Sequence, residues 1–282
     1  MKLSIPVKET IEKRRSIRTF ENKALLPADR EKLIGYMNTL SNPFDAVVNF
    51  HIAEKGISDQ GEKLGTYGVI KGASTFLGVS VPNNEFGLLA AGYEFENLIL
   101  YATDMELGTV WLAATFSKDS FSNAMKIDKE DLFIAISPVG YSSNKQTIQE
   151  KLMRKTMKAS SRKPWGELFY DENFATSLTA EKAGKYAAPL EMLRLAPSAT
   201  NAQPWRVLKF GNVYHFYETH KKNASEEEAM IKQVDLGIAI AHFHQTALEM
   251  GLSGKFEKLA QNPDMIPEDF HYMISWIAYQ PC

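Results

Sequence analysis

Two polar stretches far apart in the chain contain the side chains best suited to bind a ligand. The first, Arg14-Arg15-Ser16-Ile17-Arg18 (the arginine motif), places three guanidinium groups and a hydroxyl within five residues. Guanidinium forks and a hydroxyl match the geometry of a phosphate group. The second, residues 196–205 with the sequence APSATNAQPW (the proline–serine loop), combines two prolines with small and uncharged polar side chains. Such a loop offers uncharged donors and acceptors to a flat heterocycle.

Each stretch also has a purely structural interpretation, which the pattern alone leaves open. The arginine motif is also what a solvated basic surface turn looks like. The proline–serine loop is also what a helix-to-strand turn looks like, with Trp205 as its anchor in the core. The choice between these interpretations depends on whether the rest of the chain brings the two stretches together.

Other catalytic and metal-binding patterns are absent from the sequence. It contains no HExxH or CxxC spacing, no Gly-x-Ser-x-Gly elbow, no Walker loop and no Gly-x-Gly-x-x-Gly. His242 and His244 are two positions apart on an expected helix, so they face different sides and no metal site is expected. No nucleophile or general base stands out. The sequence therefore indicates a protein whose bound cofactor supplies the chemistry.

Composition and charge indicate a folded protein with a small-molecule partner. The 282 residues are 44% hydrophobic and 23% charged, which is ordinary for a folded domain. The 32 basic residues are balanced by 34 acidic ones, which argues against a nucleic-acid partner. Cys282 is the only cysteine, and no signal-peptide or membrane-span pattern is found. We expect no membrane partner and a reducing, cytoplasmic location.

In the first half, a short helix over residues 6–13 leads into the arginine motif. Pro27 starts a second helix. Strands are expected over residues 47–52, 75–81 and 132–139, and residues 88–107 are apolar on nearly every face. That pattern is typical of a helix buried at the centre of a domain.

In the second half, a helix from about Ala180, with a possible kink at Pro189, leads into the proline–serine loop. Residues 206–210 and 213–217 form an expected hairpin around Gly211-Asn212. A mostly apolar helix over residues 236–252 and a strand over residues 272–279 follow.

The two halves also share three sequence anchors in the same order. Residues 136–141 match residues 274–279, and Asn42-Pro43-Phe44 matches Gln203-Pro204-Trp205. In the central helices, four positions match at one constant spacing: Gly92, Ala102, Met105 and Leu107 correspond to Gly237, Ala247, Met250 and Leu252. These anchors predict a duplicated unit. The expected fold is α+β, with mixed sheets flanked by helices in two related halves, residues 1–160 and 161–282.

The arginine motif and the proline–serine loop resemble the two signature motifs of the FMN-dependent nitroreductase family. Residues 107–112 (LGTVWL) and 161–164 (SRKP) resemble two further stretches of that family. The resemblance implies that ordinary members are homodimers, with each FMN site built from the first motif of one subunit and the second motif of the other. Here each motif occurs in only one half. The chain therefore resembles a nitroreductase subgroup with two fused halves, a pseudo-dimer with one working site.

The resemblance also implies a role for each site residue. The phosphate and ribityl chain of FMN would be held by Arg14, Arg15 and Ser16, with Arg162 as a further phosphate partner. Arg18 would lie near the pyrimidine edge of the flavin as the catalytic residue, because its charge favours the negative charge of the reduced ring. The ring would be lined by Pro197, Ser198 and Asn201, supported by Gln203, and approached from the first half by Thr109, Val110 and Trp111.

The activity implied is hydride transfer from NADH or NADPH, through FMN, to a nitroaromatic, a quinone or a similar small-molecule electron acceptor. The chain would act as a monomeric pseudo-dimer or a weak homo-oligomer. One alternative is a non-enzymatic flavin-binding or sensor protein on the same fold. Another, an RNA- or phosphopeptide-binding module using the arginine motif, has little support because no aromatic platform accompanies it.

Overall fold

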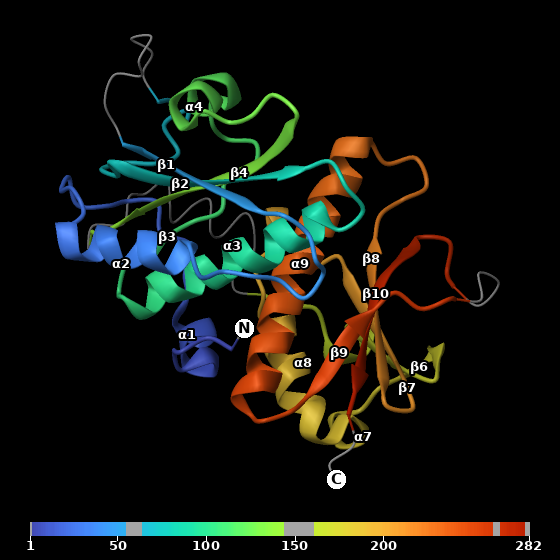
Figure 1. Cartoon of the computed structure of the whole chain (residues 1–282). Helices are drawn as coiled ribbons and strands as arrows, with labels where there is room; N and C mark the ends of the chain where they lie inside the picture. The colour runs from blue at the N-terminus through green and yellow to red at the C-terminus, as the bar shows by residue number, and fades with distance from the viewer. Residues whose placement is uncertain (1, 55–63, 144–160, 262–265, 280–282) are drawn as a thin grey trace.

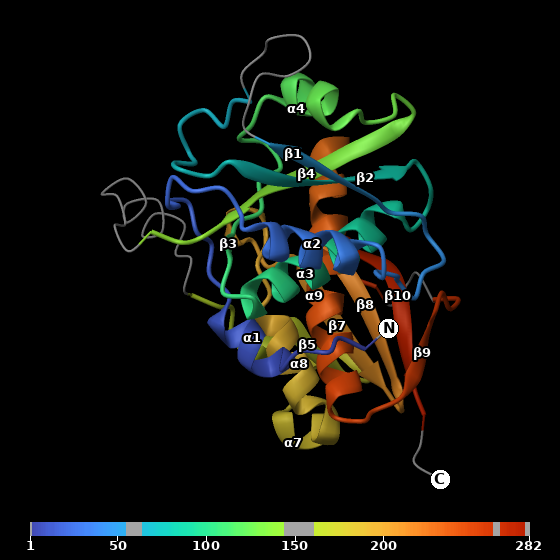
Figure 2. The same ribbon diagram turned by 60° about the vertical axis from the view of Figure 1, so that its left-hand side comes forward.

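The structure is a computed structural model that describes residues 2–54, 64–143, 161–261 and 266–279. Two long helices, α3 (Gly87–Asp104) and α9 (Glu226–Glu249), lie between two β-sheets (Figure 1). The same arrangement is visible after rotation, where α3 crosses α9 between the sheets (Figure 2). The fold is therefore α+β with its core built around two buried helices, as the sequence predicted.

The first sheet has the strand order β1-β2-β4-β3, and its four strands pair antiparallel. Their bounds are β1 (Asn49–Glu54), β2 (Thr75–Pro82), β3 (Gly108–Thr109) and β4 (Asp131–Gly140). A parallel bridge between Ser16 and Thr109 extends the edge at β3. β2 is buried along nearly its whole length because α3 covers one face of the sheet and α4 (Lys118–Met125) covers the other. The helices α1 (Val7–Lys13) and α2 (Pro27–Met37) complete this half.

The second sheet is mixed, with the order β6-β5-β7-β8-β10-β9 and a parallel pairing of β5 with β7. Its strands are β5 (Phe169–Asp171), β6 (Asn173–Ser177), β7 (Trp205–Phe210), β8 (Val213–Thr219), β9 (Gly254–Glu257) and β10 (Phe270–Ala278). Its helices, besides α9, are α6 (Trp165–Leu168), α7 (Ala180–Ala183), η1 (Gly184–Tyr186), α8 (Ala187–Arg194) and η2 (Ala199–Asn201). The predicted hairpin joins β7 to β8 through Gly211, whose φ is +59°.

The two sheets share their strand order and their register. The order β7-β8-β10-β9 repeats β1-β2-β4-β3. In the central strand pairs, Leu77–Ser137 of the first sheet corresponds to His215–Ser275 of the second, and one constant spacing relates both strands. The pair at the end of β3 and β4, Gly108–Gly140, likewise corresponds to the pair at the end of β9 and β10, Gly254–Ala278. From this agreement we propose that the two halves arose by duplication. The expected boundary near residue 160 lies outside the described residues.

The crossing of α3 and α9 depends on one glycine in each helix. A Cβ atom on Gly92 would lie 2.1 Å from the carbonyl oxygen of Val234, and a Cβ atom on Gly237 would lie 2.1 Å from that of Leu89. Each clash involves the residue three positions before the partner glycine, so the contact is reciprocal about the crossing point. Only glycine lets the two backbones approach this closely. The glycine pair that the sequence comparison matched is thus the point where the halves meet.

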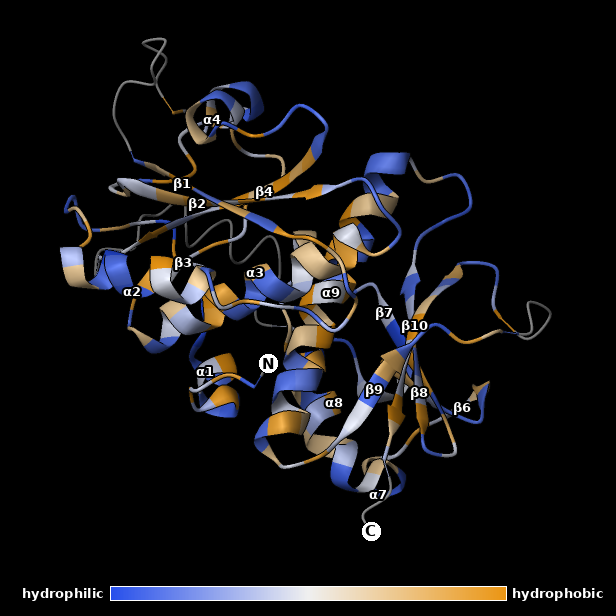
Figure 3. Ribbon diagram, in the orientation of Figure 1, coloured by the Kyte–Doolittle hydropathy of each residue, from blue (hydrophilic) through white to orange (hydrophobic). Residues whose placement is uncertain are grey.

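Buried polar residues interrupt the apolar surface of both central helices, and Figure 3 shows hydrophilic positions along α3 and α9. Glu94 and Glu96 of α3, and Asp235 and His242 of α9, are all buried. Such groups are rarely buried without partners, so they mark positions where the interior contains specific polar interactions.

Several predicted boundaries and one anchor are wrong. In the common register of the two sheets, Glu218 corresponds to Ser80. Their strand partners, Trp205 and Asn49, therefore correspond to each other as well. The predicted match of Trp205 with Phe44 is thus wrong. Phe44 instead packs edge-on against Tyr93 in the core.

The kink predicted at Pro189 lies elsewhere. The helix breaks at Gly184, with φ +56° and ψ −128°, while Pro189 lies in the first turn of α8, where its missing N–H costs no hydrogen bond. The helix α9 begins at Glu226, well before the residue 236 that the apolar pattern predicted, because Ser225 caps it by accepting from the N–H of Glu228. No helix within the described ranges is long and apolar enough to cross a lipid bilayer.

Candidate functional site

A cavity of about 460 Å³ lies between the two halves. Ten of the twelve site residues predicted from the sequence line it: Arg14, Arg15, Ser16, Arg18, Val110, Trp111, Arg162, Pro197, Ser198 and Asn201. The arginine motif and the proline–serine loop, which lie far apart in the sequence, therefore form walls of one cavity. Thr109 and Gln203 do not line it.

The arginine motif is held in place by the edge of the first sheet. The helix α1 ends at Lys13, and the backbone N–H of the following residue, Arg14, donates to the carbonyl oxygen of Thr10 (2.9 Å). The chain then becomes extended, and the N–H of Ile17 donates to the carbonyl oxygen of Thr109 (2.8 Å). A Cβ atom on Gly108 would lie 2.9 Å from the side chain of Ile17, so this close approach uses a glycine. Thr109, predicted to approach the ligand, is instead buried and acts through its backbone.

The proline–serine loop is held by side chains that the loop and α9 supply. The N–H of Ala199 donates to both carboxylate oxygens of Asp235 (3.0 and 3.2 Å), and the N–H of Gln203 donates to Ser198 Oγ (2.9 Å). Thr200, Asn201 and Gln203 all have a positive φ, between 50° and 59°. Non-glycine residues adopt this conformation only where their surroundings enforce it. The loop is therefore a preformed, strained wall of the cavity.

The ends of the loop are structural. Gln203 is buried and accepts a hydrogen bond from the N–H of Lys163 (2.7 Å), which fits the predicted supporting role but places it behind the cavity wall. Trp205 is fully buried in the core of the second half. The structural interpretation is thus correct for Trp205, while residues 197–201 line the cavity.

Arg162 joins the loop to the basic side of the cavity. Its Nη2 donates to the carbonyl oxygen of Leu195 (2.9 Å), and its Nη1 donates to Asn201 Oδ1 (3.3 Å). Burial lowers the pKa of Arg162 to about 10, and the positive charges of Arg14, Arg194 and Arg15 contribute further. The contribution of these cations to the pKa of Arg162 indicates that several positive side chains gather on this side of the cavity.

Below the cavity, a buried cluster connects the two halves. Glu96 accepts a hydrogen bond from Trp111 Nε1 (2.7 Å), lies 3.0 Å from His242 Nε2, and lies 3.7 Å from Arg14 Nε. The other ring nitrogen of His242 lies 3.0 Å from the carbonyl oxygen of Met192. His242 of α9 thus contacts α3 through Glu96 and α8 through Met192.

Arg14 therefore shares its acidic neighbour Glu96 with His242 and Trp111. Burial, the largest cause, lowers the pKa of Arg14, and the charge of Glu96 opposes that shift. The basic side of the cavity thus favours an anionic group on its ligand.

Several residues that line the cavity were not predicted from the sequence. They are an apolar set on α9, the buried Asp235, and Lys118 of α4: Lys118, Met230, Ile231, Val234, Asp235 and Ile238. Burial raises the pKa of Asp235 to about 7. An acidic residue within an apolar helix was the available signal, because a buried carboxyl needs a partner. The cavity thus combines a basic side, an uncharged polar loop and an apolar helix face. It suits a ligand with a phosphate and a flat ring.

The chain is similar to one described family and to solved structures of that type. Residues 6–247 match the family described as "Putative TM nitroreductase". The crystal structure of a "putative nitroreductase" from Thermotoga maritima is similar over 98% of this chain and 95% of that one, with a TM-score of 0.62 and 19% identity. No curated protein matches the chain.

Two other solved structures are similar to about half of the chain. An FMN-dependent nitroreductase of Clostridium difficile covers 49% of this chain and 88% of its own, with 17% identity and a TM-score of 0.40. A nitroreductase of Bacteroides fragilis with bound FMN covers 51% and 92%, with 18% identity and a TM-score of 0.40.

Proposed function

The chain belongs to the family described as "Putative TM nitroreductase", and from this premise we propose that it is an FMN-dependent oxidoreductase with one FMN site per chain. The observation that supports the proposal most strongly is the composite cavity. One of its walls is the arginine motif of the first half, and another is the proline–serine loop of the second half. The family resemblance assigns these two motifs to opposite sides of one flavin, and here they face a common space.

The residues present fit FMN by charge and by shape. Arg14, Arg15 and Ser16 would hold the phosphate, and Arg14 shares its acidic neighbour Glu96 with His242. Arg162 lies close enough to these cations for them to lower its pKa, and it would be a further phosphate partner. The volume of about 460 Å³ falls in the range of roughly 300–1,000 Å³ typical of cofactor and ligand sites.

The ring would lie between the proline–serine loop and the first half. Pro197, Ser198 and Asn201 line the loop side, and Val110 and Trp111 line the other. Trp111 is fixed by its hydrogen bond to Glu96 and by an edge-on contact with Phe95 (4.8 Å between ring centroids). Fixed walls favour binding because little side-chain freedom is lost when the ligand enters.

FMN, when bound, supplies the hydride chemistry, so the protein needs no nucleophile of its own. The contribution of Arg18 is electrostatic: its side chain lines the cavity, and a positive charge there stabilises negative charge that develops on the ligand. We propose NADH or NADPH as hydride donor, and a nitroaromatic, a quinone or a similar small molecule as acceptor.

An anaerobic experiment separates the enzyme from a flavin sensor on the same fold. Protein loaded with FMN is mixed with NADH or NADPH without oxygen, and the visible flavin absorption is followed. The proposal predicts that one of the two donors bleaches the flavin within seconds to minutes and that a nitroaromatic or quinone restores the colour. Bound flavin that neither donor reduces would contradict an NAD(P)H-dependent enzyme and favour the sensor.

A further inference from the structure

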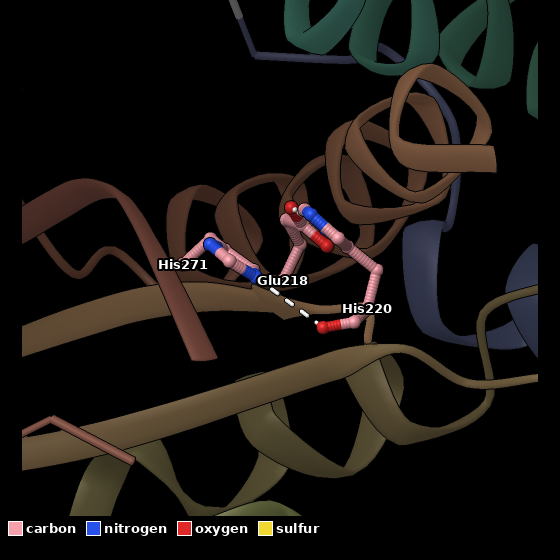
Figure 4. Close-up of side chains that lie close together, drawn as sticks. All are labelled: Glu218, His220 and His271. Carbon is pink, nitrogen blue, oxygen red and sulfur yellow. Dashed lines mark hydrogen bonds and ion pairs between the residues drawn. The ribbon is translucent and has the colours of Figure 1, made fainter. Parts of the chain in front are cut away.

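A second group of chemically active side chains lies in the second sheet, away from the residues that line the cavity. Glu218 is in β8, His220 follows that strand, and His271 is near the start of β10 (Figure 4). Glu218 and His271 are paired across the two strands, so the sheet register brings them together. No local spacing in the sequence predicted this group, because His271 comes from a different strand much later in the chain than the other two.

The three side chains are close enough to share one ion. A ligand atom from each lies within 4.8 Å of the other two. His220 Nδ1 is 2.7 Å from Glu218 Oε1, and the rings of His220 and His271 stack with centroids 3.8 Å apart. His271 Nε2 lies 3.3 Å from the carbonyl oxygen of His220, a contact that Figure 4 also shows. The stacked imidazole rings would rotate about their side-chain bonds to direct a nitrogen each, together with the carboxylate, at one ion.

The carboxylate of Glu218 supplies an independent sign of an unmet partner. Glu218 is 1% exposed, and its Oε2 has no hydrogen-bond partner among the described residues. A buried carboxylate oxygen without a partner costs free energy, so such atoms are rare in folded proteins. A cation next to Glu218 would satisfy this oxygen.

We propose that Glu218, His220 and His271 bind one divalent transition-metal ion of the Zn²⁺ class. Imidazole nitrogens and a carboxylate oxygen are ligands that suit this class. Three protein ligands leave a fourth position for water.

The related first half shows that the fold does not require these residues. At the register-equivalent positions of the first sheet, Glu218 is replaced by Ser80, His220 by Pro82 and His271 by Phe133. A strand pair with the same register is thus built without any of the three ligands. Their presence in the second half is therefore not a consequence of packing this sheet.

The position of the group suggests what the ion would stabilise. Thr219, between two of the ligands, donates from its N–H (2.7 Å) and from its Oγ1 (3.0 Å) to the carbonyl oxygen of Pro204. Pro204 belongs to the proline–serine loop. An ion bound here would fix the end of β8 against β10 directly beside the base of that loop.

Titration of the full-length, metal-free protein with Co²⁺ and Zn²⁺ tests the proposal. Co²⁺ reports its coordination through visible absorption, and Zn²⁺ should displace it. We expect one equivalent per chain in the wild type. Since loss of a mere outer-shell partner typically costs ~10–100-fold in affinity, Glu218→Gln, His220→Ala and His271→Ala should each weaken binding at least that much.

His51→Ala is the matched control, because His51 is a half-buried strand histidine of the first half that contacts Ser80 Oγ (2.9 Å). It should bind the metal as the wild type does. Thermal melts without metal identify any variant that fails to fold. If His271→Ala does not fold, the test rests on His220→Ala, because His220 lies after the end of β8 and not within a strand. The proposal is overturned if the wild type binds no Co²⁺ or Zn²⁺, or if a folded ligand variant binds them with unchanged affinity.

Discussion

The contacts of the buried Glu96 bear on how the arginine motif can attract an anion although Arg14 has an acidic neighbour. Glu96 lies 3.7 Å from Arg14 Nε and also contacts Trp111 and His242, so Arg14 shares this carboxyl with two other partners. Arg162 adds a second cation at the same side of the cavity. The site therefore has its positive charge in place before any ligand enters, which lowers the cost of binding.

Arg15 and Arg18 are proposed to act differently on the flavin, and substitution separates them. Arg15→Ala should weaken FMN binding more than it slows flavin reduction, because it removes a phosphate partner. Arg18→Ala should do the reverse, because it removes the charge proposed to lie near the ring. FMN titration gives the dissociation constants, and anaerobic stopped-flow with NADH or NADPH gives the reduction rates. Equal effects of both substitutions on both quantities would contradict this division.

Asp235 should make the stability of the protein depend on pH. Burial raises its pKa to about 7, whereas the unfolded chain ionises near 3.8. Between these values the folded state holds a proton that the unfolded state has lost, so the free energy of unfolding falls as the pH rises from about 4 to 7. At ~1.4 kcal/mol per pKa unit, the ionisation of this group lowers the free energy of unfolding by up to about 4 kcal/mol.

Asp235→Asn keeps an acceptor for the N–H of Ala199 and removes the titration. Urea unfolding of both proteins at several pH values between about 4 and 8 measures the difference. The variant should gain stability relative to the wild type as the pH rises. Parallel pH profiles for the two proteins would show that Asp235 does not titrate in this window.

At the scale of elements, the crossing of α3 and α9 sets how closely the halves approach and so how wide the cavity is. Gly92→Ala would place a methyl group 2.1 Å from the carbonyl oxygen of Val234. The helices would have to separate, which typically costs about 1–3 kcal/mol or more. Gly35→Ala in α2 is the control, since nothing lies within 4 Å of its Cβ position.

Gly35→Ala should leave stability unchanged or raise it by about 0.5–1 kcal/mol, because it removes freedom from the unfolded chain. Denaturant unfolding of the two variants and the wild type gives the comparison. If Gly92→Ala were as stable as Gly35→Ala, the tight crossing would not exist in solution.

Element prediction succeeded where the pattern was long and failed where local geometry decided. The apolar residues of α3 and α9 were found because burial on every face leaves a clear signature. The helix α4 was missed, since Lys118–Met125 is short and mostly polar. The break at Gly184 was assigned to Pro189, because a pattern does not reveal that the proline lies in a first turn. The false anchor at Phe44 arose because it is a core residue of the same chemical type as Trp205.

The residues of the candidate site were likewise predicted only in part from the sequence. The arginine motif and residues 197–201 were predicted because their residue types carry chemistry of their own. Asp235 and Glu96 were missed, since their importance depends on contacts that only the folded chain makes. Asp235 contacts Ala199. Glu96 contacts Arg14, Trp111 and His242. Likewise, Thr109 was assigned to the ligand because residues 107–112 resemble a stretch of the family, whereas its backbone carbonyl holds the arginine motif.

For the whole molecule, the two halves share a four-strand arrangement, which β5 and β6 extend in the second sheet, and they are unequal in their sites. The central strands of both sheets pair in the same register, yet the arginine motif occurs only in the first half and the proline–serine loop only in the second. In a symmetric pair both motifs would occur in both halves and give two sites. In this chain the cavity uses the single copy of each.

The number of flavins bound per chain tests this composite site most directly. Purified protein is freed of flavin, titrated with FMN, and followed by quenching of flavin fluorescence, with the chain concentration measured independently. We predict saturation at one FMN per chain, and loss of that binding when Arg14→Ala in the first half is combined with Asn201→Ala in the second. Saturation at two FMN per chain, or no binding at any FMN concentration, would contradict a single site built from both halves.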